Sequence, residues 1–471
     1  MISIINLSWV LIGLYTLYFL LFQKKKNVLL FLTSIVLFVP KVNLISIGNI
    51  STGIRVDDVI IALTFFLILL THNITTNRAL NQFIKLLAFV CLANLCSVCF
   101  SILFLNNNNL LWAVLVLIRK VEYFVLIFVG YYACYSQTSI DRDEAIYRTI
   151  SILNCAFFLI AILQMQGICG YVIKGEVRDT FSRAAVGTFN GYYEYALFLC
   201  FSNIFYFLNL KNGKHKVFSS LLCIATIIFI YFSTSRTSLL VTIIIDVILV
   251  LRWIVQLSRS KVQIAIIAIV VACLVAFILL PQMAFVLNTR FDSITISGMW
   301  KTLKTNWENA SFEGYLNYFG GGVNPDLYIG SGGDLSAALR FYKWGAIFKQ
   351  FLKYPLFGYG FGVSNVVDGN YFRLLGESGI IGTFLWLTLL FSVLKYEKNR
   401  EDRILAPVCF YITIALLLNS IFIDSFESSK VMEMYWFIIG CSIEKNGKNS
   451  CNIGVKCKDE TNTSDNPSCR G

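Results

Sequence analysis

Four arginines stand where apolar runs of the chain meet polar ones, and their side chains could bind an anion. Arg236 lies within "STSRTS" between two apolar runs, and Arg183 precedes the turn of "GTFNGYYEYALF". Arg340 and Arg373 follow in a long polar stretch. A guanidinium meets a phosphate through two parallel hydrogen bonds, so the set would suit a di-anionic lipid headgroup. For Arg236 the alternative is an interfacial anchor, and the sequence leaves open whether the four converge.

A glycine-rich segment, "LFGYGFG", precedes the last apolar runs. Its glycines Gly358, Gly360 and Gly362 could belong to a phosphate-binding loop, but that loop needs a preceding strand and a βαβ pattern, which the sequence lacks. Glycine also permits tight turns that other residues cannot make. We therefore expect a tight re-entrant turn here, leading onto a helix that starts near Gly379 and also serving a functional site.

The composition is that of a membrane protein. The chain is 57% hydrophobic and 14% charged, with a mean hydropathy of +0.70, whereas soluble domains carry roughly 25% charged residues. The net charge of +12 fits the excess of Lys and Arg in cytoplasmic loops and does not indicate a nucleic acid partner. No Lys or Arg precedes Lys24, which favours a retained first span over a cleaved signal peptide.

Apolar runs of about twenty residues predict an all-α integral membrane protein with about 12–13 transmembrane helices. The spans are expected at residues 5–22, 27–46, 57–70, 83–105, 110–133, 146–166, 188–210, 217–234, 237–257, 262–281, 379–394, 404–423 and 431–443. With Lys24–Lys26 placed in the cytoplasm, the cytoplasmic segments hold roughly three times as many Lys and Arg residues as the short outer loops. The N-terminus is therefore expected outside and the C-terminus inside.

One long connection divides the chain. Residues 282–378 form a polar, aromatic stretch on the predicted outer side, and loops this long are usually functional or disordered. Helical spacing of Leu339, Tyr342, Ala346, Ile347 and Phe351 predicts an amphipathic helix within it. The expected domains are an N-terminal bundle of about ten spans (1–281), the long extracytoplasmic loop (282–378), the C-terminal spans (379–443) and a disordered cytoplasmic tail (444–471). The cysteines lie mostly within spans as small hydrophobic residues, so no metal site is expected.

Four motifs together resemble the O-antigen ligase and polymerase superfamily of multi-span membrane enzymes. They are "GIRVDDVIIAL" opening an early span, "GTFNGYYEYA" opening a middle one, "STSRTSLL" at a hairpin, and "YPLFGYGFG" followed by "NYFRLLGESGIIG" at the end of the long loop. The last motif is the most specific, because its spacing, its glycines and its position before a helix all agree with the family.

The resemblance implies glycosyl transfer on the outer face of the bacterial cytoplasmic (inner) membrane. A saccharide would leave undecaprenyl diphosphate and join a hydroxyl group of an acceptor. Because diphosphate is already a good leaving group, we expect the transfer to need no cofactor or metal ion and to proceed with inversion. Arginines could stabilise the charge that develops on the leaving diphosphate. Arg236 and Arg340 are the first candidates for this role, followed by Arg183 and Arg373. The expected substrate-binding residues are Arg183, Arg373, Asn370, Tyr371 and Glu194. Aromatic residues of the long loop could stack on sugars or simply form its core.

One departure from the family pattern bears on the reaction. Ligase members carry a His-Asn pair before the Tyr of the last motif, whereas this chain has Asp368, Gly369, Asn370 and Tyr371. His72 and His215, the two histidines, fall in loops predicted to be cytoplasmic. Asp368 is therefore the first candidate for a general base and Glu377 the second. The departure favours the polymerase (Wzy-type) branch over the ligase branch.

The predicted function is polymerisation of undecaprenyl-diphosphate-linked oligosaccharide units into O-antigen, capsule or exopolysaccharide. A repeat-unit flippase and a chain-length regulator are possible partners. An O-antigen ligase is one alternative. A transporter is another, which would use intramembrane charges such as Asp246, Arg119 and Glu122 but would leave the long outer loop unexplained.

Overall fold

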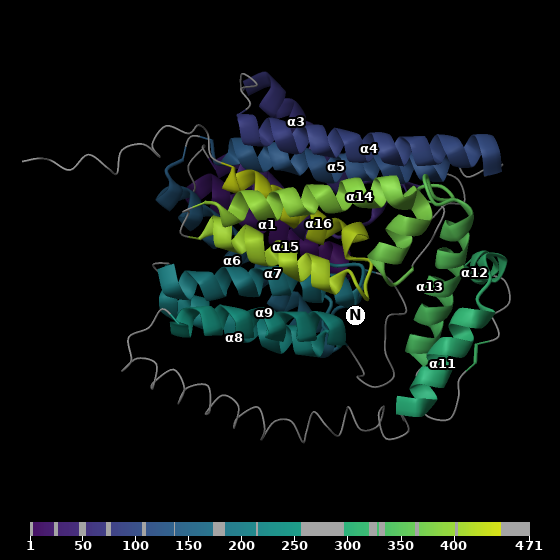
Figure 1. Cartoon of the computed structure of the whole chain (residues 1–471). Coiled ribbons are helices and arrows are strands. Elements are labelled where there is room, and N and C mark those ends of the chain that lie inside the picture. Colours follow the sequence, from purple (N-terminus) through teal and green to yellow (C-terminus); the bar gives the residue numbers. More distant parts are fainter. Residues whose placement is uncertain are drawn as a thin grey trace, which may run out of the picture.

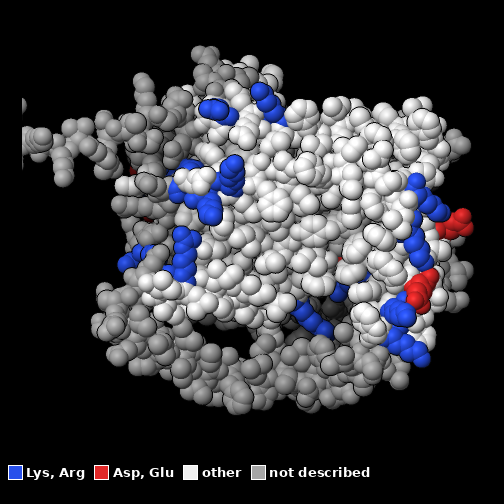
Figure 2. Space-filling model, in the orientation of Figure 1, with Lys and Arg blue, Asp and Glu red and all other residues white. Residues whose placement is uncertain are grey.

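The chain folds into a helical bundle with a second helical layer across one of its ends (Figure 1). The computed structural model describes residues 3–22, 27–46, 53–71, 77–105, 110–135, 137–172, 184–212, 215–255, 296–319, 327–328, 335–362, 367–400 and 404–443. On the face shown in Figure 2, Lys and Arg gather at the two ends of the molecule and leave an uncharged band between them. Such a band is suited to a bilayer, where charged side chains are costly.

The bundle is built from antiparallel helices joined mostly by short connections. Its helices are α1 (Ile4–Phe22), α2 (Val28–Phe38), α3 (Val56–Thr71), α4 (Arg78–Leu105), α5 (Leu110–Ala133), α6 (Ser139–Met165), α7 (Tyr192–Asn212), α8 (Lys216–Phe232), α9 (Arg236–Val255), α14 (Asn370–Lys398), α15 (Leu405–Asn419) and α16 (Ser429–Ser442). The layer across the end consists of α11 (Ile296–Asn309), α12 (Phe312–Phe319) and α13 (Leu335–Lys353). A short 3₁₀ helix, η2 (Ser425–Glu427), lies between α15 and α16.

The predicted all-α membrane fold is confirmed. Each expected span within the described residues contains a helix, because runs of apolar residues decide where the chain can cross a bilayer. In this part of the chain α1, α4, α6, α9 and α14 are long and apolar enough to cross a membrane by length and composition, and α2, α8 and α15 are shorter apolar helices. The expected span 262–281 and the tail 444–471 lie outside the described residues.

The second expected span, 27–46, is wrong at its end. Helix α2 stops at Phe38, where Val39 has an extended conformation (φ −57°, ψ 131°). Pro40 follows, and proline disfavours the helical conformation of the residue before it. The chain then forms a short antiparallel ribbon of β1 (Asn43–Ser46) and β2 (Gly53–Arg55), an addition to the all-α fold.

Helix α14 begins at Asn370 rather than near Gly379, and it is broken at Gly379 (φ 63°). The glycine-rich turn fills the break: Tyr359 N donates to Gly376 O at 2.8 Å, and Ile380 N donates to Pro355 O at 2.8 Å. A Cβ atom on Gly379 would lie 2.2 Å from Leu356 O, so no larger residue fits there. The predicted re-entrant turn is therefore real, and it supplies partners for backbone groups that a broken membrane helix would leave unpaired.

The end layer has its own core. Helix α13 is the amphipathic helix predicted from sequence, and it packs along α11 (Figure 1). The buried side chains of this core are Ala310, Tyr315, Tyr342, Trp344, Ala346, Ile347, Tyr359 and Val367. A Cβ atom on Gly345 would lie 2.9 Å from Trp307 O, so this glycine lets α11 and α13 approach closely. Trp307 and Trp344 pack within the layer, whereas Trp300 is 68% exposed.

Two glycines bring α16 into the centre of the bundle. A Cβ atom on Gly130 of α5 would lie 2.1 Å from Phe437 O, and one on Gly440 of α16 would lie 2.1 Å from Ile127 O. Small residues of this kind let membrane helices pack backbone to backbone. Every residue of α16 is buried, so the start of α16 lies deep within the protein.

Candidate functional site

The connection between α15 and α16 joins several helix ends beneath the end layer. Asn419 accepts a hydrogen bond from Ser238 of α9 at 3.3 Å and donates one to Ser425 at 2.9 Å. Ser420 O accepts from Asn370 N, the first residue of α14, at 3.0 Å. Arg55, the last residue of β2 and directly before α3, donates to Ser429 at 3.3 Å. The N-termini of α3, α9, α14 and α16 thus meet at one place, and helix N-termini favour an anion nearby.

Asp424 holds the "DGNY" segment against this connection. Its carboxylate accepts hydrogen bonds from Val367 N at 3.0 Å and Gly369 N at 3.1 Å, and Arg373 lies 3.4 Å away. Burial raises the pKa of Asp424, and Arg373 and the two backbone N–H groups offset part of that rise. Gly369 is required at its position, because a Cβ atom there would lie 2.6 Å from Trp344 Nε1.

Asp368 is held by two consecutive residues of α13. Lys343 Nζ lies 2.8 Å from Asp368 Oδ2, and the Lys343 side chain is 4% exposed while that of Asp368 is 33% exposed. Trp344 Nε1 donates to Asp368 O at 3.1 Å. Asp368 has a left-handed backbone conformation (φ 58°), which is uncommon outside glycine. Within the described residues no donor contacts its Oδ1 atom, so this partly exposed carboxylate retains one oxygen for a ligand.

Asn370 and Tyr371 start helix α14 with different environments. Asn370 is 1% exposed, and its Oδ1 atom accepts from Phe426 N at 2.8 Å. Its Nδ2 atom is buried and has no hydrogen-bond partner among the described residues. Tyr371 donates its hydroxyl to Leu417 O at 2.8 Å. Asn370 therefore retains one donor for a ligand or a water molecule, whereas the Tyr371 hydroxyl is engaged with the protein.

Arg373 and Glu377 form a buried ion pair on one face of α14. Arg373 Nε lies 3.2 Å from Glu377 Oε1, with side chains 11% and 2% exposed. Glu427, in η2, forms a separate pair with Lys120 of α5 at 2.7 Å. Burial alone would raise the pKa of Glu427, but Lys120 and then Arg373 outweigh it, and the pKa is lowered. The position of Glu377 suits holding Arg373 better than meeting a substrate.

Arg236 and Arg340 lie on two elements that border this region. Arg236 is exposed at the first turn of α9, and the hydrogen bond from Ser238 to Asn419 ties that turn to the α15–α16 connection. Arg340 is half-buried, and its Nε atom has no hydrogen-bond partner in the described part of the chain. It shares a face of α13 with Lys343 and Trp344, three and four residues further on. Arg183 lies outside the described residues.

Basic groups also mark a hollow at this end of the molecule. Figure 2 shows Lys or Arg atoms within a depression between the helix ends of the bundle and the α11–α13 layer. A concave, positively charged opening of this kind concentrates anionic ligands.

Glu194 lies in a neighbouring buried cluster. Its two oxygens accept from Lys430 N at 3.2 Å and Asn190 N at 3.3 Å, so it caps the start of α16. Lys430 Nζ donates to Thr188 O at 2.8 Å. Through these contacts Glu194 stabilises the start of α16, and its role in substrate binding stays a prediction.

A further ion triad lies beside this cluster. Lys41 pairs with Asp57 of α3 and, at 2.5 Å, with Glu433 of α16. Burial alone would lower the pKa of Lys41, but the two carboxylates outweigh it and raise the pKa. The triad joins the segment after α2 to the starts of α3 and α16.

Sequence reasoning missed the acidic partners supplied by the α15–α16 connection, Asp424 and Glu427. It recognised Lys120 and Lys343 as charged residues of their helices but did not assign them to the site. A signal for the first two existed. The stretch "IDSFESSKVMEM" places two Asp or Glu residues directly before one of the shortest predicted spans, and charge at such a position is usually buried and paired. No sequence pattern could show that α5 supplies the partner of Glu427.

The fold and the candidate site together define a class of protein. It is a multi-pass helical membrane protein with a basic recess at one end, beside the aromatic layer of helices α11–α13. Residues 221–387 match a family model described as O-antigen ligase. This match covers α8 to the middle of α14, including Arg236, Arg340, Asp368 and Glu377. It confirms the resemblance to the O-antigen ligase and polymerase superfamily, and that family implies a membrane enzyme of glycan transfer in general. No match to a curated protein was found. The family match gives no support to the transporter alternative.

Proposed function

We propose that the protein polymerises oligosaccharide repeat units carried on undecaprenyl diphosphate into a surface polysaccharide, which would be O-antigen, capsule or exopolysaccharide. A hydroxyl group of the acceptor attacks the anomeric carbon of the donor glycan. The bond from that carbon to the diphosphate breaks, the diphosphate leaves with the electron pair, and the hydroxyl proton passes to a base. Attack opposite the leaving group inverts the anomeric configuration.

Guanidinium groups stabilise the leaving diphosphate in this proposal. The first candidates are Arg236, which is exposed at the N-terminus of α9, and Arg340 of α13, whose Nε atom has no hydrogen-bond partner among the described residues. Donors placed where charge develops lower the barrier most when little water competes with them. Arg373 is tied to Glu377 and Asp424, so it contributes positive charge beneath the recess rather than a mobile binding group. Arg183 remains a proposed fourth contact.

Asp368 is the proposed general base, and its surroundings support that role. One carboxylate oxygen is fixed by Lys343 at 2.8 Å, which sets the direction of the other. A base must lie within hydrogen-bonding reach of the hydroxyl proton, and a fixed carboxylate keeps that geometry from one turnover to the next. Asn370 Nδ2 is the donor available to hold a sugar or phosphate oxygen beside it.

The observation that carries the proposal is the position of Asp368. It is partly exposed and is held by an ion pair with Lys343 of α13. It is also adjacent to the α15–α16 connection, which anchors the turn that carries Arg236. The test uses Asp368→Asn and Arg236→Gln in the native host, with polysaccharide resolved by length on gels. We expect loss of the polymer ladder with single repeat units still attached to the acceptor. Normal ladders from both variants, at wild-type protein level, would refute the assignment.

An O-antigen ligase is the second candidate, and the matching family model carries that description. Both reactions use the same donor chemistry, so the acceptor decides between them. A deletion of a ligase leaves full-length polymer on its lipid carrier, whereas a deletion of a polymerase leaves single units transferred to the final acceptor. Mass analysis of the lipid-linked pool in a deletion strain distinguishes the two.

The proposal also requires the α11–α13 end to face away from the cytoplasm, at the outer face of the bacterial inner membrane. Leu352 of α13 is 61% exposed and gives a site for labelling. In a background lacking exposed cysteines, Leu352→Cys should react with a membrane-impermeant maleimide in intact spheroplasts. Reaction only after the membrane is opened would refute this orientation. A flippase that supplies repeat units and a chain-length regulator are the proposed functional partners.

A further inference from the structure

A second cavity lies far from the proposed active site, at the opposite end of the bundle. It consists of two adjoining hollows between α1, α2 and α6, which share Tyr15, Tyr18 and Ile152 in their linings. The hollow nearer the helix ends measures about 240 Å³ and is lined partly by polar residues. The other measures about 430 Å³ and is lined almost entirely by apolar residues. The combined groove is therefore amphiphilic along its length.

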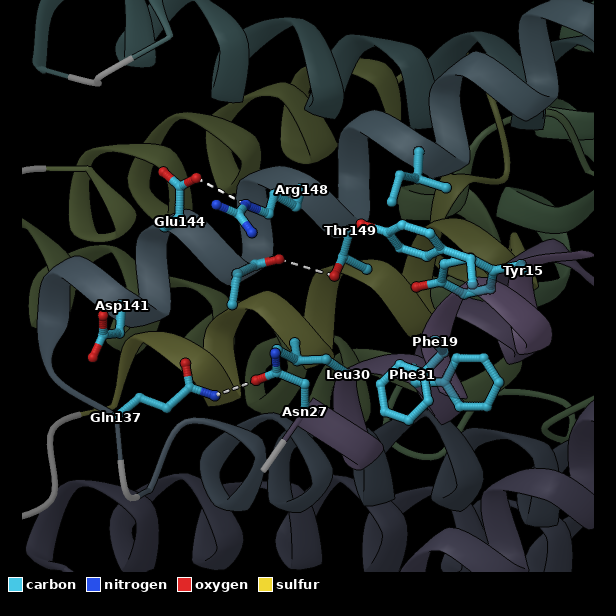
Figure 3. A pocket seen from close by; sticks show the side chains of 13 residues that line it. Tyr15, Phe19, Asn27, Leu30, Phe31, Gln137, Asp141, Glu144, Arg148 and Thr149 are labelled. Atoms are coloured by element: carbon cyan, nitrogen blue, oxygen red, sulfur yellow. Dashed lines mark hydrogen bonds and ion pairs between the residues drawn. The ribbon is translucent and has the colours of Figure 1, made fainter. Parts of the chain in front are cut away.

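The polar hollow is shown in Figure 3. Asn27 and residues of the α6 region line one side, and Tyr15, Phe19 and Phe31 line the other (Figure 3). Arg148 Nε lies 2.9 Å from Glu144 Oε1, and His215 Nε2 lies 3.0 Å from the same oxygen. Asp141 adds a second carboxylate to the lining. The lining thus contains two acidic side chains and one guanidinium, which complements a ligand that carries a positive group near a negative one.

Gln137 supplies a second, independent observation. Its Nε2 atom donates to Ala133 O at 3.1 Å and to Asn27 Oδ1 at 3.3 Å. Because Ala133 O can only accept, these contacts fix the orientation of the amide. The Oε1 atom is left buried and without a donor among the described residues. Since a buried acceptor without a donor is costly, a donor that reached this oxygen from the hollow would stabilise this part of the lining.

The apolar hollow indicates where the rest of the ligand would lie. Its lining includes Leu11 and Leu14 of α1, Ile35 and Phe38 of α2, and Ala156 of α6. Leu14 is 59% exposed, so the hollow opens on the lateral surface of the bundle, where lipid chains surround a membrane protein. An acyl chain can enter from the bilayer without crossing a polar barrier.

We propose that this groove binds one phospholipid with a primary ammonium headgroup, of the phosphatidylethanolamine type. One acyl chain occupies the apolar hollow, and the headgroup lies in the polar hollow. The ammonium donates to the Gln137 carbonyl and faces the carboxylate of Asp141, and the phosphate lies towards the guanidinium of Arg148. The bound lipid fills the space between α1 and α6 and stabilises α1 against the bundle. The site is independent of the proposed transfer reaction.

The test measures lipid binding to the full-length protein purified in detergent, by native mass spectrometry. Three lipids with identical acyl chains are compared: phosphatidylethanolamine, phosphatidylcholine and phosphatidylglycerol. We expect phosphatidylethanolamine to be retained about tenfold more than either of the others, because only it combines a positive charge with N–H donors; tenfold corresponds to about 1.4 kcal/mol. Equal retention of phosphatidylcholine, or stronger retention of phosphatidylglycerol, would overturn the proposal without any variant.

Two variants localise the binding. Gln137→Leu removes the buried acceptor, and Ala156→Trp fills the apolar hollow; each should lower phosphatidylethanolamine retention to the level of phosphatidylcholine. Leu240→Trp is the matched control for the larger side chain, because Leu240 is 55% exposed on α9, outside the groove. Unchanged retention in both groove variants would place the bound lipid elsewhere and refute the site. If a variant does not fold, the comparison of lipids on the wild-type protein still decides the headgroup.

Discussion

Replacement of Asp424 by Asn tests whether the α15–α16 connection positions the candidate base. Asp424 accepts from two backbone N–H groups, of Val367 and Gly369, and faces Arg373 at 3.4 Å, with its side chain 10% exposed. Asn keeps the shape, but it can accept only one of the two hydrogen bonds and turns an NH₂ group towards the other donor. The substitution therefore acts on the conformation of residues 367–370.

The size of the effect follows from these contacts. One buried N–H group without an acceptor costs about 1–3 kcal/mol, and Arg373 loses one of its charged partners while keeping Glu377. A total of about 3 kcal/mol, of which most falls on the 367–370 segment, corresponds to about a 100-fold lower population of the aligned Asp368, since about 1.4 kcal/mol is a factor of ten. We expect the rate of glycan transfer to fall by about that factor, with a smaller effect on the melting temperature of the whole bundle.

The assay uses purified protein in lipid nanodiscs with a lipid-linked repeat unit as substrate, and initial rates are measured together with the melting temperature. Glu308→Gln is the matched control. Glu308 is 60% exposed and lies 3.8 Å from Lys304 on α11, and exposed pairs contribute little, so its rate should match wild type. A folded Asp424→Asn protein with a rate within about threefold of wild type would show that the connection does not position the base.

Three further outcomes are expected. Lys343→Met should lower the transfer rate at least about tenfold while leaving the bundle folded. The substitution frees the carboxylate of Asp368 but keeps the apolar stem of the side chain at position 343. A wild-type rate would show that Lys343 is not part of the site. Gly379→Ala should abolish accumulation of folded protein, because its Cβ atom would lie 2.2 Å from Leu356 O at a residue with φ +63°. The control Gly13→Ala should be neutral, because nothing lies within 4 Å of the added atom. Equal yields of the two variants would contradict the broken-helix account. The pKa of Glu427 is lowered on folding, so its stabilising effect is present above the ordinary glutamate value of 4.5 and is lost as pH falls through the lower folded-state pKa. Melting temperatures of wild type and Glu427→Gln should therefore converge in acid and differ at neutral pH, and a constant difference would count against the pair with Lys120.

The helices were largely predictable because a bilayer restricts the chain so strongly. A segment that crosses it must be apolar and must satisfy its own backbone hydrogen bonds, and both requirements are local in sequence. The same reasoning located α13, whose apolar positions recur at helical spacing. It failed at the second span, where Pro40 ends α2 before the apolar run is complete, and at α14, where helix starts at Asn370 and continues past the break at Gly379.

The candidate site was predictable only in part. Asp368 and Asn370 are recognisable by their motif, and the structure places Asp368 against α13 and Asn370 against the α15–α16 connection. The role of Glu377 could not be read in advance, because its burial against Arg373 depends on the kink that brings residues 355–360 into α14. Asp424 lies more than fifty residues from Gly369 along the chain and contacts it at 3.1 Å, which no local pattern encodes.

The amino-acid sequence by itself determined that this is a multi-span helical membrane protein, where most of its apolar helices lie, and which motif carries the candidate base, because each of these depends on hydrophobicity or on residues adjacent along the chain. Only the tertiary structure decided which charges meet: Asp424 with the backbone of the "DGNY" segment, Lys343 with Asp368, and Lys120 with Glu427. Such pairs depend on the packing of helices that are distant in sequence, and a charge buried among apolar helices is stable only where that packing supplies its partner.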